Sequence, residues 1–152
     1  MNEPKPNLVV QYQTLVIIWA AILMSQLIFL LVLFFTKREL FEFRFDQPIT
    51  GQSGTMILGF AVAALTCVGF SFAFKRRFVE RAIAEQNPAH VNTGTIIALA
   101  LCEAASIIGL CLAFAFDYQY FFLWFALGTI GILLHFPRQI DVQSAGYKRD
   151  QR

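Results

Sequence analysis

One acidic residue, Glu103, lies inside a long stretch of apolar sequence. The nearest other charged residues are Glu85 on one side and Asp117 on the other. If this stretch crosses a bilayer, an ionised carboxylate at its centre costs at least about 2.5 kcal/mol unless a donor or water lies beside it. Apolar surroundings disfavour the charged form. We therefore expect Glu103 to be protonated at neutral pH and to act as a reversible proton-binding group.

Few polar side chains lie at a depth comparable to that of Glu103. Ser106 follows it by three residues, which places both on one face of a helix. Thr66 lies near the middle of a second apolar stretch, and Ser25 and Gln26 lie in the middle of a first. We assign proton or ion binding to Glu103, with Ser106 and Thr66 as supporting residues. A purely structural polar contact of Glu103 is the alternative.

The composition indicates which elements must position this carboxylate. Of the 152 residues, 57% are hydrophobic and only 14% are charged, whereas about a quarter of the residues in a soluble domain are charged. This excludes a disordered chain, a disulfide scaffold and an ordinary soluble enzyme. Apolar stretches near the roughly 20 residues that a crossing requires predict membrane helices at about 15–35, 56–74, 96–116 and 120–136.

The sequence therefore predicts an all-α, polytopic membrane protein with four transmembrane helices in a single domain, residues 1–152. Helical spacing of apolar residues extends the second helix to about residue 85, and Asn92 or Thr93 is the expected cap of the third. Residues 137–152 are expected to form a polar cytoplasmic tail without regular structure. Three cysteines, which lack a CxxC spacing, are assigned to packing: Cys67, Cys102 and Cys111.

Small residues recur along the two middle helices. They let helix backbones approach closely in lipid, so we expect helices two and three to form a tight, central antiparallel hairpin. The third helix carries Ala98, Cys102, Ala105, Gly109 and Ala113, and the second carries Gly59, Ala63, Cys67 and Ser71.

The distribution of Lys and Arg predicts the orientation, because positively charged short loops stay in the cytoplasm. With four crossings, the N-terminus, the second loop and the C-terminal tail lie on one side and hold nine of the twelve basic residues. The first loop holds the other three. We expect both termini on the cytoplasmic side of the cell inner (plasma) membrane.

The first loop alternates Phe41, Phe43 and Phe45 with charged residues, a period of two that is typical of an extended segment. It is interpreted as lying at the membrane surface, with a docking strip for a partner as the alternative. His90 and His135 lack partners at metal-ligand spacing, so no metal, other cofactor or nucleic acid is expected.

The third predicted helix resembles a known family. Its stretch GTIIALALCEAASIIGLCLAFAF is similar to the carboxylate-bearing helix of subunit c, the proteolipid of ATP synthase rotors. The preceding Gln86, Asn87 and Pro88 resemble that family's polar loop. The resemblance, over about residues 86–116, implies that Glu103 carries protons. It also makes sodium less expected than protons, because Ala104 stands where sodium-binding members tend to have a hydroxyl.

Two functions follow from this sequence. The first is proton binding or translocation by a subunit-c-like hairpin, in a rotary-ATPase-like or other membrane complex. The second is a non-transporting accessory or assembly subunit, in which Glu103 contacts a donor of another membrane protein. Expected partners are the lipid bilayer and other membrane subunits, as a homo-oligomer or a heteromer. No nucleophile, base and oxyanion donor can be grouped, so no enzyme activity is expected.

Overall fold

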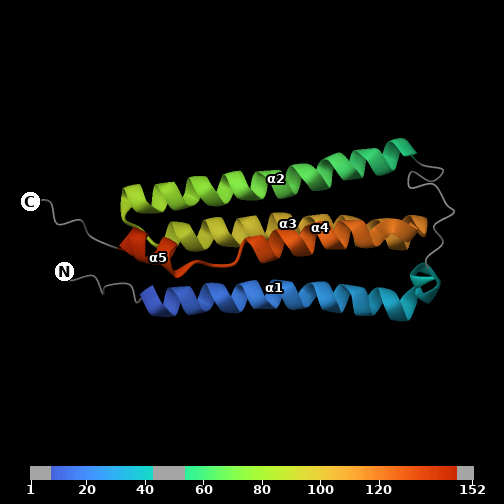
Figure 1. Cartoon of the computed structure of the whole chain (residues 1–152), viewed down its shortest axis with the longest axis horizontal. Helices are drawn as coiled ribbons and strands as arrows, with labels where there is room; N and C mark the ends of the chain where they lie inside the picture. Colours follow the sequence, from blue (N-terminus) through green and yellow to red (C-terminus); the bar gives the residue numbers. More distant parts are fainter. Residues whose placement is uncertain (1–7, 43–53, 147–152) are drawn as a thin grey trace, which may run out of the picture.

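The computed structural model describes residues 8–42 and 54–146, and within these ranges the chain is helical, without a strand. Five α-helices and two short 3-10 helices follow one another along the chain (Figure 1). The α-helices are α1 (Leu8–Thr36), α2 (Gly54–Glu85), α3 (Ala89–Phe116), α4 (Phe122–Leu134) and α5 (Gln139–Gly146), and the 3-10 helices are η1 (Arg38–Phe41) and η2 (Gln119–Phe121).

Three helices are long and apolar enough to cross a membrane, and they are α1 with 29 residues, α2 with 32 and α3 with 28. Each exceeds the roughly 20 residues that a crossing requires. The three run side by side along the long axis of the molecule (Figure 1). These apolar helices support a membrane protein.

Helix α4 is shorter than the fourth helix that the sequence predicts at about 120–136. It has 13 residues, which at 1.5 Å per residue span about 20 Å, less than the roughly 30 Å of a hydrocarbon core. Helices α4 and α5 meet the criterion for a crossing only together, across a break bent by 46°. Pro137 lies in this break, and a proline cannot continue a helix without loss of a hydrogen bond.

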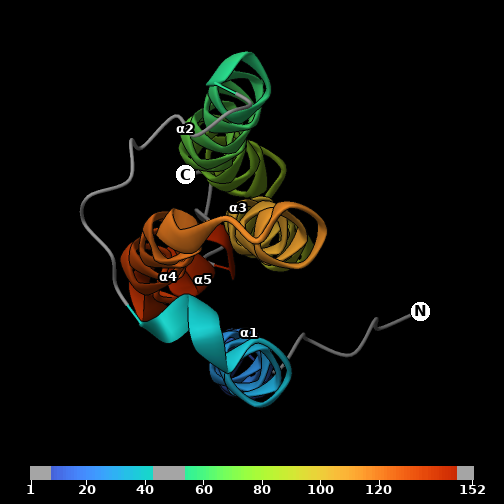
Figure 2. The ribbon, with the colours of Figure 1, turned by 90° about the vertical axis from the view of Figure 1, so that its right-hand side faces the viewer.

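Helix α3 lies at the centre of the bundle, between α2 on one side and α1 on the other, with α4 beside it (Figure 2). The predicted small residues of α3 are all buried there: Ala98, Cys102, Ala105, Gly109 and Ala113. Small side chains at these positions allow α3 to pack against several neighbours at once.

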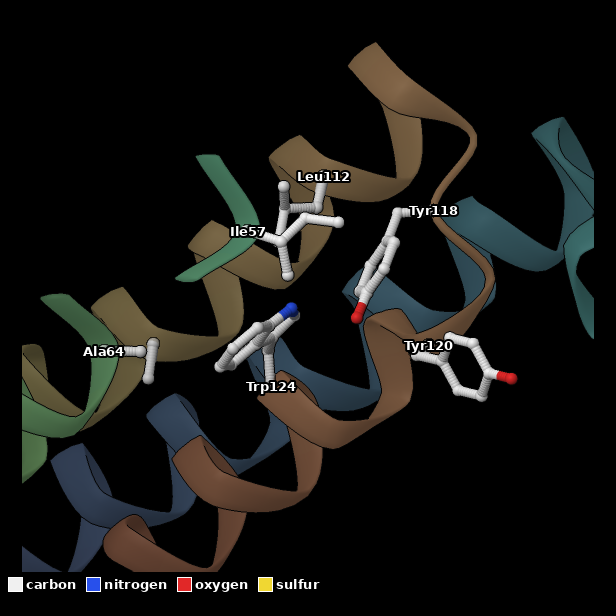
Figure 3. Packing of buried hydrophobic residues seen from close by; sticks show 7 residues of the cluster. Ile57, Ala64, Leu112, Tyr118, Tyr120 and Trp124 are labelled. Atoms are coloured by element: carbon white, nitrogen blue, oxygen red, sulfur yellow. The ribbon is translucent and has the colours of Figure 1, made fainter. Parts of the chain in front are cut away.

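Of the four predicted small residues of α2, only Ser71 is buried. A Cβ atom at Gly59 would have no heavy atom within 4 Å, and Ala63 is exposed. In this part of α2 the buried residues are Ile57, Ala64 and Ser71, at a spacing of seven. A spacing of four drifts around a helix of 3.6 residues per turn, whereas a spacing of seven stays on one face. Figure 3 shows Ile57 and Ala64 in the cluster with residues of α3, η2 and α4.

The turns between helices are short. Gln86 after α2 and Asp117 after α3 both adopt positive φ, 51° and 48°, the left-handed conformation that commonly ends helices. Helix α3 begins at Ala89, after Pro88, and therefore earlier than the expected caps Asn92 or Thr93. A proline suits the start of a helix because the amides of the first turn have no partner within the helix.

The described part of the tail forms α5, contrary to the expectation of a polar tail without regular structure. Its two buried residues, Val142 and Ala145, are three positions apart and belong to one cluster with Leu15, Ala82 and Val91. One short apolar face is thus enough to dock α5 against α1, α2 and α3. The third apolar residue of α5, Ile140, is exposed, so the apolar residues of this short helix show no helical periodicity in sequence.

The first loop is described only as far as Glu42. Phe41 lies in η1, so the predicted extended segment is wrong at this position, and its ring packs 5.4 Å from that of Phe121. Phe43 and Phe45 lie outside the described residues.

Candidate functional site

Glu103 lies near the middle of α3 on the side that faces α1. Its Oε1 atom accepts a hydrogen bond from Ser25 Oγ of α1, at 2.5 Å. Glu103 and Ser25 are both only partly exposed. The one acidic residue within the apolar part of α3 is therefore paired with a hydroxyl from another helix of the same chain.

The Ser25 hydroxyl has a second possible acceptor. Its Oγ lies 2.7 Å from the carbonyl oxygen of Ile22, one turn earlier in α1. A serine carries one hydroxyl proton and can also accept hydrogen bonds. With Glu103 ionised, Ser25 donates to the carboxylate. With Glu103 protonated, the carboxyl group donates to Ser25 Oγ, and the serine proton turns to Ile22.

Gln26 adds a second polar side chain beside this pair. It is 2% exposed, and its Nε2 donates to Ser25 Oγ at 3.5 Å. Its Oε1 atom is buried and has no hydrogen-bond partner among the described residues. We call Ser25, Gln26 and Glu103 the α1–α3 polar cluster. A buried amide oxygen without a partner can accept a hydrogen bond from a water or a proton donor.

Apolar residues lie on both sides of the polar cluster along the bundle. Towards the N-terminus of α1, the side chains of Ile22 and Leu23 pack against a core that contains Leu99 and Ile132. Towards its C-terminus, Leu33 and its neighbours pack against residues of η1, α3, η2 and α4. The polar cluster is thus a local interruption of an otherwise apolar interface.

Ser106, a predicted supporting residue, is not brought to Glu103. It is fully buried, and its Oγ lies against α4, where a Cβ atom added at Gly128 would overlap it. Its Oγ has no hydrogen-bond partner in the described parts of the chain. A step of three residues turns a helix by about 300°, which is enough to direct Glu103 to α1 and Ser106 to α4.

Thr66, the other predicted supporting residue, also lies away from Glu103. It is exposed on α2, and its hydroxyl donates to the carbonyl oxygen of Val62 in the same helix, at 2.6 Å. Helices α1 and α2 lie on different sides of α3 (Figure 2). Ser25, Gln26 and Thr66 all lie at a depth similar to that of Glu103. Depth alone does not reveal which of these side chains faces Glu103.

A second polar group lies between α2, α3 and α4. Cys102 Sγ is 3.4 Å from Ser71 Oγ and 3.9 Å from His135 Nδ1. Its members already have backbone acceptors, because Ser71 donates to Val68 and His135 Nδ1 lies 2.7 Å from Gly131 O. The described residues contain no group of three His, Cys, Asp or Glu side chains that could hold a metal ion.

Comparison of the chain with protein-family models, curated proteins and solved structures finds no match.

Proposed function

We propose that this chain is a multi-pass protein of the cell inner membrane in which Glu103 binds and releases a proton. The observation that carries the proposal is the 2.5 Å contact between Glu103 Oε1 and Ser25 Oγ. Intramembrane acids are rare and mark proton or ion pathways by default. The Ser25 hydroxyl accommodates the carboxyl group in both protonation states, which a reversible site requires.

The proposed topology has four crossings, with α4 and α5 forming the bent fourth crossing. The described ends of the chain support an even number, because a Cβ atom at Gly146 would lie 2.7 Å from Leu8 Cδ2. This end of the bundle also has Lys75, whose Nζ donates to His135 O at 3.3 Å. We therefore place both termini in the cytoplasm. Alkaline phosphatase is active only after export, so an active fusion after residue 152 would contradict this orientation.

The resemblance of residues 86–116 to subunit c supports proton binding by Glu103. We do not extend the proposal to a rotor ring, because α3 is packed by α1, α2 and α4 of its own chain and Glu103 already has a partner within it. The membrane hairpin of α2 and α3 belongs to the proposal. The structure supports it by the extensive packing of these two helices along each other.

Carbodiimide labelling tests the proton site, because the reagent modifies protonated carboxyl groups in apolar surroundings. We expect labelling of Glu103 in the full-length protein in detergent, with a rate that falls as the pH rises. Peptide mass spectrometry locates the adduct. Glu103→Gln serves as the control for labelling at this position, and Glu80→Gln, on the exposed part of α2, as the control for a change of one carboxylate. A lack of labelling at Glu103 throughout the pH series would overturn the proposal.

The second candidate function is that of an accessory or assembly subunit. It is favoured by the outer face of α2, where Cβ atoms added at Gly59 and Gly69 would have no heavy atom within 4 Å. Small residues on a lipid-exposed face allow another membrane helix to approach. Native mass spectrometry of the complex extracted in mild detergent distinguishes the candidates, since a stoichiometric heteromer supports the accessory function.

A further inference from the structure

A cavity of about 300 Å³ lies where α2 meets α5 and the end of α4. Five of the nine residues that line it are charged. These are three cations, Lys75, Arg76 and Arg138, and two carboxylates, Glu80 and Asp141. The cavity lies apart from the α1–α3 polar cluster, and none of its lining residues belongs to that cluster.

Two of the three cations are not neutralised by an ion pair. Arg76 Nε bonds Glu80 Oε1 at 2.8 Å. Lys75 Nζ donates only to His135 O, at 3.3 Å, and an ammonium group has three donors. Within residues 8–42 and 54–146, neither Lys75 nor Arg138 forms an ion pair with a carboxylate. Asp141, which also lines the cavity, lies near enough to Lys75 to offset part of its charge. The three cations still outnumber the two carboxylates of the lining, and Lys75 keeps donors that no carboxylate uses.

His135 also lines the cavity, but its ring is engaged within the chain through Nδ1, which lies 2.7 Å from Gly131 O. The His135 side chain is fully buried. Its Nε2 atom has no hydrogen-bond partner in the described part of the chain. With the Nδ1 proton directed at Gly131 O, a neutral ring leaves Nε2 as an acceptor, so His135 is not counted among the donors to an anion.

The cavity also adjoins apolar surface. Phe72 and Leu134 line it, and these side chains are 44% and 62% exposed. Lys75 directly follows the apolar stretch that ends at Phe74. In the proposed topology this is the level at which lipid headgroups meet the hydrocarbon core.

From these features we infer that the cavity binds a phosphate group, with Lys75 and Arg138 as the principal ligands. An ammonium and a guanidinium group donate charge-assisted hydrogen bonds to phosphate oxygens. Basic pockets at the cytoplasmic ends of membrane helices take the headgroups of anionic lipids in this way. A phosphate group can also belong to a soluble ion, and the two sources differ in whether the apolar edge at Phe72 and Leu134 is used.

The test uses the full-length protein in detergent, with dioleoyl phosphatidic acid as the anionic lipid, dioleoyl phosphatidylcholine as the lipid without net charge, and inorganic phosphate as the soluble ion. Native mass spectrometry counts bound lipid, and calorimetry follows phosphate. The variants are Lys75→Gln and Arg138→Gln. The matched control is Arg77→Gln, because Arg77 is an exposed member of the same basic segment that does not line the cavity.

We expect phosphatidic acid to bind in preference to phosphatidylcholine. Removal of one cation is worth about 1 kcal/mol, so Lys75→Gln and Arg138→Gln are each expected to raise Kd about fivefold. Arg77→Gln should leave Kd within about twofold. Equal binding of inorganic phosphate would identify the soluble source, and preference for the lipid would identify the headgroup.

Binding of neither phosphatidic acid nor phosphate would overturn the inference. So would an equal effect of all three substitutions, since this would indicate a diffuse surface charge. Lys75→Gln removes the contact with His135 O and can impair folding, in which case Arg138→Gln alone tests the site. Lys75→Arg keeps the positive charge and should retain binding. The lipid source rests on the membrane location proposed above. Glu103→Gln should bind phosphatidic acid as the wild type does, so failure of the proton site is distinguishable from failure here.

Discussion

A Cβ atom added at Gly128 would overlap the Oγ atom of Ser106, so α3 and α4 touch there almost backbone to backbone. The same atom would lie 2.8 Å from the carbonyl oxygen of Cys102. The Cys102 carbonyl belongs to the backbone of α3, so it cannot move without a shift of the helix. Gly128 therefore sets the distance between the two helices.

We expect Gly128→Ala to lower the stability of the protein. Overpacking of a tight interface costs about 1–3 kcal/mol, and the measurement is the thermal unfolding midpoint in detergent. Gly59→Ala is the matched control, because a Cβ atom there has no heavy atom within 4 Å and alanine favours a helix over glycine. An equal decrease for both substitutions would contradict a specific contact at Gly128.

Trp19 joins α1 to the end of α4. Its Nε1 donates to Ile132 O at 2.8 Å, and its ring packs edge-on against Phe136 with 5.0 Å between ring centroids. Trp19→Phe keeps an aromatic ring and removes the donor, which is worth about 0.5–1.5 kcal/mol. We expect a corresponding decrease in the free energy of unfolding, measured by reversible denaturation.

Trp124→Phe provides the comparison, since Trp124 Nε1 has no hydrogen-bond partner among the described residues. This substitution removes the same atoms without loss of a hydrogen bond. Any loss from Trp124→Phe thus measures the smaller ring alone. Equal losses of unfolding free energy for Trp19→Phe and Trp124→Phe would contradict a stabilising hydrogen bond at Trp19.

The sequence predicts the long helices well because the apolar stretches in α1, α2 and α3 are each longer than a crossing needs. It is less informative about α4, because hydropathy does not show that the helix ends before His135. The helix-to-helix contacts depend on rotation about each axis. A sequence pattern does not give this rotation: the small residues of α3 are all buried, whereas Gly59 of α2 has no neighbour within 4 Å of a Cβ atom.

The unknown rotation of each helix also explains why the partner of Glu103 could not be predicted. Glu103 could be identified from its charge alone, and Ser25 could be matched to it in depth. The sequence favours Ser106 as the supporting residue because it follows Glu103 by three residues, a spacing that places both on one helix face. The structure directs Ser106 to α4 instead. The rotation of α1 that brings Ser25 to Glu103 is set by packing over the whole helix and has no local signal.

Val142 tests whether α5 is held by its buried apolar face. It is 1% exposed, in a cluster with residues of α1, α2 and α3. Val142→Ala removes two methyl groups at about 0.8 kcal/mol each, so we expect a loss of about 1.5 kcal/mol or more, together with faster proteolysis near α5. Ile140→Ala is the matched control, because Ile140 is 66% exposed. Equal protease sensitivity of the two variants would count against docking by Val142.

Ser25→Ala tests the role of the hydroxyl at Glu103. Its removal deprives the ionised carboxylate of a donor at 2.5 Å and favours the protonated form. A hydrogen bond to a charged group is worth about 1.5–3 kcal/mol, which corresponds to about tenfold or more in the proton equilibrium. At a pH where wild-type labelling is partial, we therefore expect carbodiimide to react faster with Glu103 in the variant.

Ser106→Ala is the control, because it removes a hydroxyl without a hydrogen-bond partner among the described residues. It should label at the wild-type rate. Identical rates for Ser25→Ala and the wild type would mean that the hydroxyl does not control proton binding, and an equal increase for Ser106→Ala would mean that helix packing does.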